Sequence, residues 1–303
     1  MKVLITGATG LIGKELTEVL LQNNHTVHYL TTSSLKIHNK DNYFGFYWNP
    51  QEGKIDESCI EGVDVIIHLA GTSISKRWTN SYKQEIIESR VLSANLLFNL
   101  LKKAPNQVKH FVSASGTAIY PDSNTAVYDE FSTEIEDSFL GNVVVKWEEG
   151  ADQFRLLDIK VTKIRTGIVF SEKGGALLEM IKPIKMYVGS CFGSGSQIQS
   201  WIHLTDVANL YHFVIQNKIE GVINAVSPNA ITNKALTKSI AHHLKRPLFL
   251  PNIPQFMMKL ILGEMSILLF NNKKIIPKKT LEVGFKFEFP TIELALKNII
   301  KNS

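Results

Sequence analysis

Hydrophobic residues recur along the chain in two alternating patterns. Short apolar runs such as 63–69 are typical of buried strands, whereas residues 81–103 carry apolar side chains at the spacing of one helix face. The runs predict strands at 3–5, 26–31, 44–48, 63–69, 108–113, 160–170 and 221–225, and helices at 11–23, 81–103, 140–156 and 206–216. Strands that alternate with such helices indicate βαβ units, so we expect an α/β fold with a doubly wound parallel sheet.

Three glycines stand between the first predicted strand and the first predicted helix. Gly7 allows a tight turn, Gly10 allows the backbone to approach a pyrophosphate, and Gly13 allows the helix to pack closely on the strand. The helix then points its first amides at the anion. Glycines also mark ordinary turns, but the position between a strand and an amphipathic helix favours a Rossmann-type dinucleotide site.

The alternation of strands and helices weakens after about residue 171, where glycines cluster and prolines begin to scatter. We therefore expect a dinucleotide-binding domain over 1–170, completed by about 204–226, and a smaller substrate-side region over 171–203 and 227–303. The apolar stretch 256–270 is interrupted by Lys259, Gly263 and Glu264 and is too short to cross a bilayer. It predicts a buried or partner-facing helix.

The end of the second predicted strand bears on the choice of cofactor. An NAD site usually places an acidic residue there to bind the ribose hydroxyls. Here Thr31 and Thr32 are followed by two serines, and no acid lies between Glu18 and Asp41. Hydroxyl groups and Lys36 could hold a 2′-phosphate, which favours NADP, with NAD as the alternative. Ordinary loop residues would explain the same composition.

Composition excludes several other classes of protein. The 303 residues are 44% hydrophobic with a formal net charge of +5, which describes a globular chain with a sizeable core. Cys59 and Cys191 lie far apart without metal-ligand spacing, which indicates a reducing, cytoplasmic setting and no metal site. Lysines gather at 273, 274, 278 and 279 without a nucleic-acid-binding motif. We expect a small-molecule substrate, no nucleic-acid partner and no membrane partner, and an oligomer is compatible with the sequence.

Several segments carry a resemblance to a known family. The opening TGATGLIG and the run DVIIHLAG at 64–71 resemble the extended short-chain dehydrogenase/reductases. Later segments narrow the resemblance to a subgroup labelled epimerase family protein, and together they span nearly the whole chain. These segments are RWT at 77–79, SR at 89–90, KWE at 146–148, GGA at 174–176, GSGSQ at 193–197, SWIH at 200–203, GEM at 263–265, PKK at 277–279 and GF at 284–285.

The resemblance implies which residues meet the cofactor. In that family the residues at Gly7, Gly10, Leu11 and Ile12 surround the pyrophosphate, and those at Thr31 and Thr32 meet the adenosine phosphate end. The residues at Leu69 and Ala70 line the adenine–ribose path, and those at Glu85 and Arg90 approach the cofactor from the long helix. The family commonly has Arg at position 32, so Thr32 weakens the expected grip on a 2′-phosphate.

The chain differs from typical extended reductases in the residues that would transfer a proton. Typical extended reductases use a Tyr-x-x-x-Lys pair in which the lysine lowers the tyrosine pKa for proton exchange. Counting back from Glu148 places this pair at Leu140 and Val144, which cannot ionise, and no tyrosine of the chain has a lysine four residues later. The subgroup also lacks the pair. Ser115 follows the strand where these enzymes keep a hydroxyl that binds the substrate carbonyl, although a serine at a strand end can equally be a turn former.

Further candidates for a substrate cleft come from loops beyond the strand ends, where such folds bind ligands. They are Arg77, Trp78, Trp147, Gln197, Trp201 and His203. His203 could donate a proton, but it could equally be a core histidine of a partly buried strand. Glu148 could border the cleft or bond nearby backbone. Tyr120 and Tyr128 could reach the site or cap a hydrophobic cluster.

Two functions follow from these residues. The first is an NADP(H)-dependent oxidoreductase or epimerase acting on a small carbonyl, an alcohol or a nucleotide-sugar-like compound, with Ser115 orienting the reacting oxygen. The second is a non-catalytic module that binds a nicotinamide cofactor and reports its redox state. Polar residues around the cleft favour the first hypothesis, and the loss of the ionisable pair at 140 and 144 favours the second.

Overall fold

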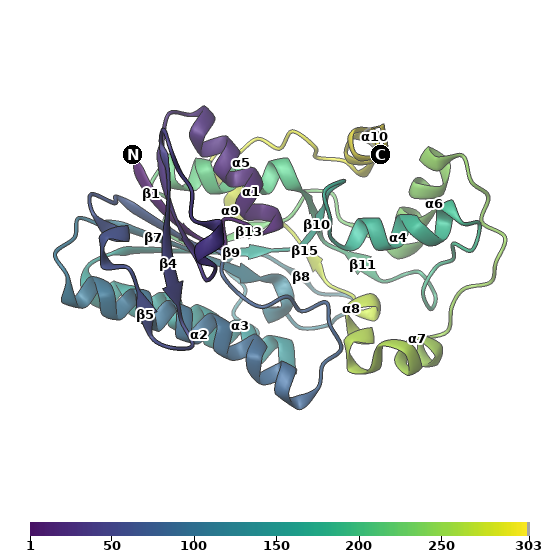
Figure 1. Ribbon diagram of the computed structural model, residues 1–303. Helices are drawn as coiled ribbons and strands as arrows, with labels where there is room; N and C mark the ends of the chain where they lie inside the picture. The colour runs from purple at the N-terminus through teal and green to yellow at the C-terminus, as the bar shows by residue number, and fades with distance from the viewer. Residues whose placement is uncertain (302–303) are drawn as a thin grey trace.

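The computed structural model describes residues 1–301, and within them a nine-stranded sheet forms one half of the molecule (Figure 1). Its strands lie in the order β13-β9-β7-β6-β1-β2-β4-β3, and β5 pairs with β4. The pairs from β13 to β4 are parallel, whereas β3 and β5 pair antiparallel with β4. The strands are β1 Lys2–Thr6, β2 Thr26–Thr31, β3 Asn39–Lys40, β4 Tyr43–Asn49, β5 Lys54–Ile55, β6 Val65–His68, β7 His110–Gly116, β9 Lys160–Thr166 and β13 Gly221–Ala225.

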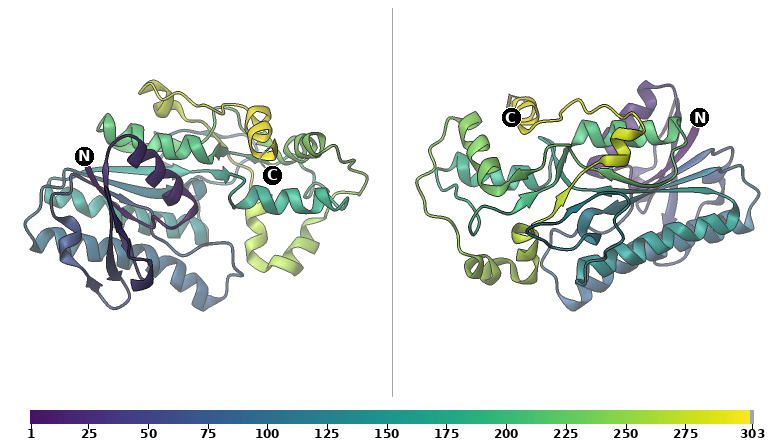
Figure 2. Two further views of the ribbon diagram at one scale, coloured as in Figure 1. Left: turned by 45° about the horizontal axis from the view of Figure 1, so that its top comes forward. Right: turned by 180° about the vertical axis from the view of Figure 1, so that it is seen from behind.

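Helices cover both faces of this sheet, as Figures 1 and 2 show. Helices α1 (Leu11–Gln22) and α5 (Leu204–Gln216) pack on one face, and α2 (Asn80–Lys103) and α3 (Phe139–Asp152) pack on the other. Side chains of β1 alternate between the two cores: Val3 and Ile5 join the α1–α5 core, and Leu4 joins the opposite core. Both faces are buried, which is why this parallel strand reads as a continuous apolar run.

The rest of the chain forms a second region beyond the carboxyl ends of the strands. Its core gathers Phe170, Trp201 and apolar residues of three helices. The elements here are β8 Val127–Tyr128, β10 Ile168–Phe170, β11 Ile198–Gln199, β12 Trp201–His203, β14 Ile231–Thr232 and β15 Lys274–Ile275, with α4 Ala176–Lys185, α6 Asn233–Leu244, α7 Gln255–Leu262, α8 Ile267–Phe270 and α10 Ile292–Lys301. Helix α9 Lys278–Glu282 packs instead on β13 of the main sheet. The 3₁₀ turns of the chain are η1 Ser34–Lys36, η2 Glu57–Ile60, η3 Thr117–Ile119, η4 Gln153–Leu157 and η5 Gly263–Ser266.

The doubly wound α/β fold predicted from the sequence is confirmed, and two local predictions are wrong. The expected strand 160–170 breaks at Gly167, where a Cβ atom would lie 2.5 Å from the carbonyl oxygen of Ser200. This close approach ends β9 at Thr166, and β10 then pairs with β12 outside the main sheet.

The apolar stretch 256–270, predicted as a buried or partner-facing helix, is neither one helix nor buried, and its partner-facing role stays a prediction. It forms α7 and α8 with a 3₁₀ turn between them, and no residue of α7 or α8 is buried. Of the helices formed by residues 1–301, none combines the length and apolarity that crossing a membrane requires.

Candidate functional site

The turn from β1 into α1 can be made only with glycines. Gly7 has a φ of +72°, and a Cβ atom there would lie 3.0 Å from the carbonyl carbon of Leu69. A Cβ atom on Gly13 would lie 2.2 Å from the carbonyl oxygen of Gly7. Leu69 and Ala70 are held beside this turn because both donate their backbone N–H to Thr6 Oγ1, at 3.1 and 3.0 Å. Residues far apart in the sequence therefore meet at the carboxyl edge of the sheet.

The N-terminus of α1 has no internal partner for its charge. Gly10 occupies the N-cap position without a side-chain hydrogen bond, and the first turn, which starts at Leu11 and Ile12, holds no acidic residue. The first amides of a helix carry a partial positive charge that attracts anions. A dinucleotide's pyrophosphate fits this position. Glycines leave the space beside the turn open, whereas other residues would fill it with a Cβ atom or a capping side chain.

The end of β2 offers hydroxyl groups and no carboxylate. Thr31 is buried and accepts the N–H of Ser33 at its Oγ1 atom, at 3.2 Å, whereas Thr32 and Lys36 are exposed. A phosphate at this end would therefore meet Thr32 and Lys36 without an opposing negative charge, and the choice of NADP over NAD stays a prediction.

Arg90 is a buried cation without a carboxylate partner among residues 1–301. Its residue is 8% exposed, its Nη1 atom donates to the carbonyl oxygens of Ile86 and Thr72, at 2.8 and 3.2 Å, and its Nε atom has no acceptor. The guanidinium lies 4.5 Å from the ring centre of Trp147, whose indole N–H also lacks an acceptor. Burial lowers the pKa of Arg90 to about 10. Two unsatisfied buried donors indicate a place where a ligand supplies the acceptors.

Glu85, the other predicted cofactor residue on α2, is exposed and lies near Arg90 in sequence. Its Oε1 atom accepts a hydrogen bond from Thr72 Oγ1 at 3.0 Å. The same loop residue thus contacts both Glu85 and Arg90, which ties the start of α2 to the loop after β6.

The two positions where an ionisable pair is missing, 140 and 144, hold apolar side chains that pack in the protein interior. Leu140 belongs to an apolar cluster with Trp78, Ile86 and Val143, and Val144 belongs to another with Tyr120 and Tyr128. Both side chains are buried, at 7% and 4% exposure. Neither can exchange a proton, and no titratable group of α3 occupies their place.

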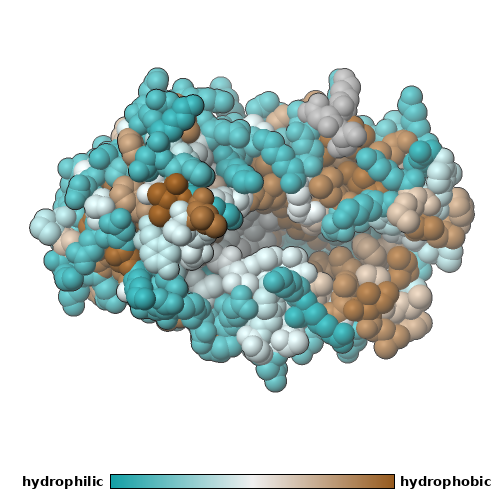
Figure 3. Space-filling model, viewed as in Figure 1, coloured by the Kyte–Doolittle hydropathy of each residue, from teal (hydrophilic) through white to brown (hydrophobic). Residues whose placement is uncertain are grey.

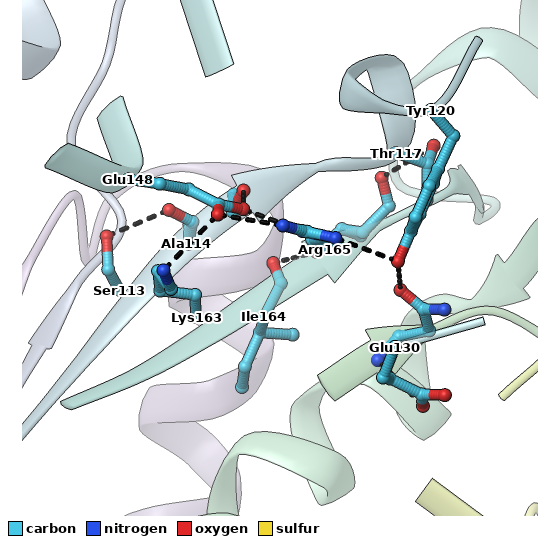
Figure 4. Close-up of polar contacts among 12 residues, drawn as sticks. Ser113, Ala114, Thr117, Tyr120, Glu130, Glu148, Lys163, Ile164 and Arg165 are labelled. Carbon is cyan, nitrogen blue, oxygen red and sulfur yellow. Dashed lines mark hydrogen bonds and ion pairs between the residues drawn. The ribbon is translucent and has the colours of Figure 1, made fainter. Parts of the chain in front are cut away.

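A buried ionic network lies beside Ser115, at the carboxyl ends of β7 and β9. Figure 4 shows its members Glu148, Arg165 and Lys163. Ser115 Oγ donates to Glu148 Oε1 at 2.6 Å, and Arg165 donates to both oxygens of that carboxylate, from Nε at 2.7 Å and from Nη2 at 2.9 Å. Lys163 Nζ lies 3.4 Å from Glu148 Oε2. Glu148 therefore bonds side chains of neighbouring strands instead of its own backbone.

The charges of this network set its protonation state. Burial by itself would raise the pKa of Glu148, but the hydrogen bonds and charge of Arg165, the Ser115 hydroxyl and the Lys163 ammonium outweigh it and hold the pKa below its usual range. Arg165 also donates to Tyr120 Oη at 3.0 Å, and Tyr120 donates to Asn224 Oδ1 at 2.8 Å. Burial raises the pKa of Tyr120, so this phenol stays protonated. Tyr120 and Tyr128 stack in a hydrophobic cluster, as one of the two sequence-based alternatives expected.

The structure separates the six predicted substrate residues into two groups. Arg77 is exposed, Trp78 packs on Leu140 and donates its indole N–H to the Ile74 carbonyl at 2.9 Å, and Trp147 covers Arg90. These three lie near the carboxyl edge of the sheet, around the start of α2 and α3. Their contact with a substrate stays a prediction.

The other three are engaged in the second region. Gln197 Nε2 bridges the carbonyl oxygens of Phe192 and Leu269, at 3.1 and 3.0 Å, and Trp201 is fully buried with its N–H on the Asn229 carbonyl, at 2.9 Å. His203 Nδ1 accepts the N–H of Thr205 and so caps α5. Burial lowers the pKa of His203 to about 4. All three side chains have structural partners, and their substrate role also stays a prediction.

Sequence reasoning missed the Glu148–Arg165 pair. The two residues lie 17 positions apart, on a helix and on a strand, and no local spacing rule connects them. The only available signal was charge in otherwise apolar surroundings, since Lys163 and Arg165 fall inside a predicted buried strand.

Comparison with known proteins agrees with this geometry. Residues 3–139 match the model of the NAD dependent epimerase/dehydratase family, and residues 253–299 match a domain of unknown function, DUF1731. The chain is 34% identical to the epimerase family protein YfhF of Bacillus subtilis (strain 168), over 99% of this chain and 98% of the relative. It is 33% identical to the epimerase family protein SAR0825 of Staphylococcus aureus (strain MRSA252), over 98% of both chains.

Solved structures extend the comparison. The crystal structure of the human epimerase family protein SDR39U1 (isoform 2) with NADPH matches with a TM-score of 0.86 and 31% identity, and the match covers all of both chains. MoeE5 in complex with UDP-glucuronic acid and NAD matches with a TM-score of 0.78 over 99% of this chain and 98% of MoeE5, and at 18% identity it shows a shared fold. The chain therefore belongs to the NAD dependent epimerase/dehydratase family, among its epimerase family proteins that end in a DUF1731 domain.

Proposed function

We propose that the chain binds NADP(H) along the carboxyl edge of its sheet and uses it to oxidise or reduce a small carbonyl or alcohol compound. The observation that carries the proposal is the uncapped N-terminus of α1 behind a turn that only glycines can make. The unpaired Arg90 gives a second anchor. SDR39U1, which was crystallised with NADPH, supports the choice of NADP, and the exposed Thr32 keeps NAD as the alternative.

The residues that would hold the cofactor follow from their positions. Gly7, Gly10, Leu11 and Ile12 would surround the pyrophosphate, Thr31 and Thr32 would meet the adenosine phosphate end, Leu69 and Ala70 would line the path between them, and Glu85 and Arg90 would close it from α2. When bound, the nicotinamide would supply or accept the hydride.

This chain's own residues offer little for proton transfer. Ser115 already donates its only hydroxyl proton to the ionised Glu148, so it can accept a hydrogen bond more readily than it can donate one. Glu148 is held ionised by Arg165, which makes it a weak base. Proton exchange would then rest on water, and the loss of a positioned acid–base group costs a rate factor of about 10² to 10⁴.

A second candidate is a non-catalytic module that binds the nicotinamide cofactor and reports its redox state. The packing of Leu140 and Val144 into two apolar clusters favours it, because the site keeps its shape without an ionisable group. The first candidate is preferred because the unsatisfied donors of Arg90 and Trp147 leave polar contacts for a ligand.

Substitution of Gly10 separates cofactor binding from folding. In a Gly10→Asp variant the ordinary φ of −76° and the N-cap preference of Asp favour α1. The added Cβ atom would lie 3.2 Å from the Gly7 carbonyl oxygen, a tight contact that an Asn at this position would share. The Asp carboxylate would face the pyrophosphate, so we expect calorimetry to show an NADPH affinity lowered about a hundredfold or more, as like charges at one site repel. Gly10→Asn is the matched control with the same shape and no charge, and its loss should be much smaller. The proposal fails if the wild type binds neither NADP(H) nor NAD(H), or if Gly10→Asp binds as tightly as Gly10→Asn.

A second measurement distinguishes the enzyme from the module. Absorbance of bound NADPH is followed in a stopped-flow instrument against a panel of aldehydes and ketones. Oxidation with any member of the panel supports the enzyme, whereas tight binding without oxidation across the panel supports the module.

A further inference from the structure

Exposed apolar side chains are concentrated at one end of the molecule. Of the 19 large hydrophobic residues that are exposed among residues 1–301, ten lie in the two short segments 186–188 and 249–267. Exposed apolar side chains gathered in this way mark an interaction site. The ten residues are Met186, Tyr187, Val188, Phe249, Leu250, Phe256, Met257, Leu260, Ile261 and Ile267.

Helix α7 forms the main part of this surface. None of its eight residues is buried, and Phe256, Leu260 and Ile261 are 66%, 77% and 66% exposed. Figure 3 shows a hydrophobic area at the lower right, over the place of α7 in Figure 1. An apolar helix in water loses the burial that normally stabilises it, so α7 is an unpartnered element.

The two segments lie side by side. Arg246 stacks over the ring of Tyr187 at 4.5 Å, Ser190 Oγ donates to the Pro251 carbonyl at 2.5 Å, and Ile253 donates its N–H to the Cys191 carbonyl at 2.8 Å. The loop after α4 therefore runs along the loop before α7. We call the surface made by the ten residues the apolar face.

The charge around the apolar face is mainly positive. Residues 180–205 and 221–267 contain seven Lys or Arg residues and one acid, Glu264, which pairs with Lys83. They contribute +6 to a chain whose net charge is +5, which leaves −1 for all other residues. Lys259 is exposed on α7, and the exposed Lys185 and Lys245 lie within four residues of the two segments. A negatively charged partner therefore complements the apolar face.

We propose that the apolar face docks onto a lipid bilayer surface that carries anionic head groups. An apolar helix with lysines beside it, lying in the plane of the interface, is the arrangement that binds such surfaces, because apolar side chains enter the acyl boundary while lysines reach the head groups. Flexible lysine stems suit this position. This proposal departs from the sequence-based expectation of no membrane partner, on the ground that α7 is exposed.

Charge and composition disfavour the other occupants. A second copy of the chain would place lysines against lysines across a symmetric interface. A protein interface is depleted in lysine and takes arginine as its preferred cation, whereas six of the seven cations here are lysines. A lipid surface fits both observations.

Vesicle flotation with the full-length chain tests the proposal. Vesicles of phosphatidylcholine alone are compared with vesicles that also contain phosphatidylglycerol. We expect binding to the mixed vesicles, weaker binding to phosphatidylcholine alone, and a loss of binding as salt is raised, because salt screens the lysines. Lys259→Glu should lower the partition coefficient about fivefold or more. Lys102→Glu, which reverses an exposed charge on α2, is the matched control and should bind like the wild type.

A double variant, Leu260→Asp with Ile261→Asp, tests the apolar contribution. Both residues are exposed, so the chain should keep its fold, and the partition coefficient should fall more than about tenfold. Leu156→Asp replaces an 80% exposed leucine in η4 and should leave binding unchanged. The proposal is overturned if mixed vesicles do not bind the wild type, or if the double variant binds as well as Leu156→Asp. It is also overturned if light scattering finds a dimer of the wild type that the double variant dissolves, which would assign the apolar face to a second copy.

Discussion

The substitution Glu148→Gln tests whether the network beside Ser115 is structural. Glu148 and Arg165 are an ion pair whose side chains are only 8% and 9% exposed. Glutamine keeps the shape of the side chain but removes the negative charge, so Arg165 remains as a buried cation with no carboxylate. Breaking one partner of a buried ion pair costs about 3–5 kcal/mol of unfolding free energy, and we expect a loss in this range.

A double variant tests whether the unpaired charge, and not the lost side chains, causes the destabilisation. Replacing both partners, with Glu148→Leu and Arg165→Met, removes both buried charges, and we expect it to cost less than Glu148→Gln alone, because apolar residues of similar volume can replace a buried pair without penalty. Asp152→Asn is the control: Asp152 is 40% exposed and pairs with Lys163, so its loss should stay within about 1 kcal/mol. Urea unfolding followed by circular dichroism measures each free energy.

The pH dependence of stability has a defined sign. Because the folded-state pKa of Glu148 lies below its unfolded value, the ion pair contributes stability above the unfolded pKa and loses it as pH falls through the folded pKa. The wild type should therefore lose stability in acid more steeply than Glu148→Gln. The reasoning is refuted if Glu148→Gln costs less than about 1 kcal/mol, or if it abolishes turnover without a loss of stability, since the second result would make Glu148 a catalytic group.

Three further predictions follow from single residues. Thr32→Arg should raise the preference for NADPH over NADH about tenfold, because a guanidinium binds a phosphate with charge-assisted hydrogen bonds, and calorimetry with both cofactors measures it. His203→Asn should leave the pH profile of any NADPH oxidation unchanged between about pH 6 and 8, since the pKa of His203 is about 4 and Asn keeps the cap of α5; a lost inflection would assign proton transfer to His203. Gly167→Ala should lower the free energy of unfolding by about 1–3 kcal/mol, because its Cβ atom would lie 2.5 Å from the Ser200 carbonyl oxygen, and an unchanged urea midpoint would contradict this.

The sequence by itself determined the sheet and the turn at its edge. A parallel strand buried on both faces must be apolar throughout, so Val3 to Ile5 could be read directly as β1, and a turn as tight as that at Gly7 requires glycine. The absence of a proton-transferring pair at 140 and 144 could also be recognised from the sequence, because it depends on residue identity and spacing alone.

Tertiary structure decided the partners of buried polar groups and the exposure of apolar ones. Glu148 pairs with Arg165 across a helix–strand contact, whereas Arg90 has no carboxylate partner among residues 1–301, although nothing in their local sequence distinguishes the two cases. The apolar run at α7 predicts a buried or partner-facing helix, and the folded chain leaves this helix without a buried residue. Local patterns indicate which side chains prefer burial. Whether a helix or strand is actually covered depends on contacts between distant parts of the chain, which only the folded structure supplies.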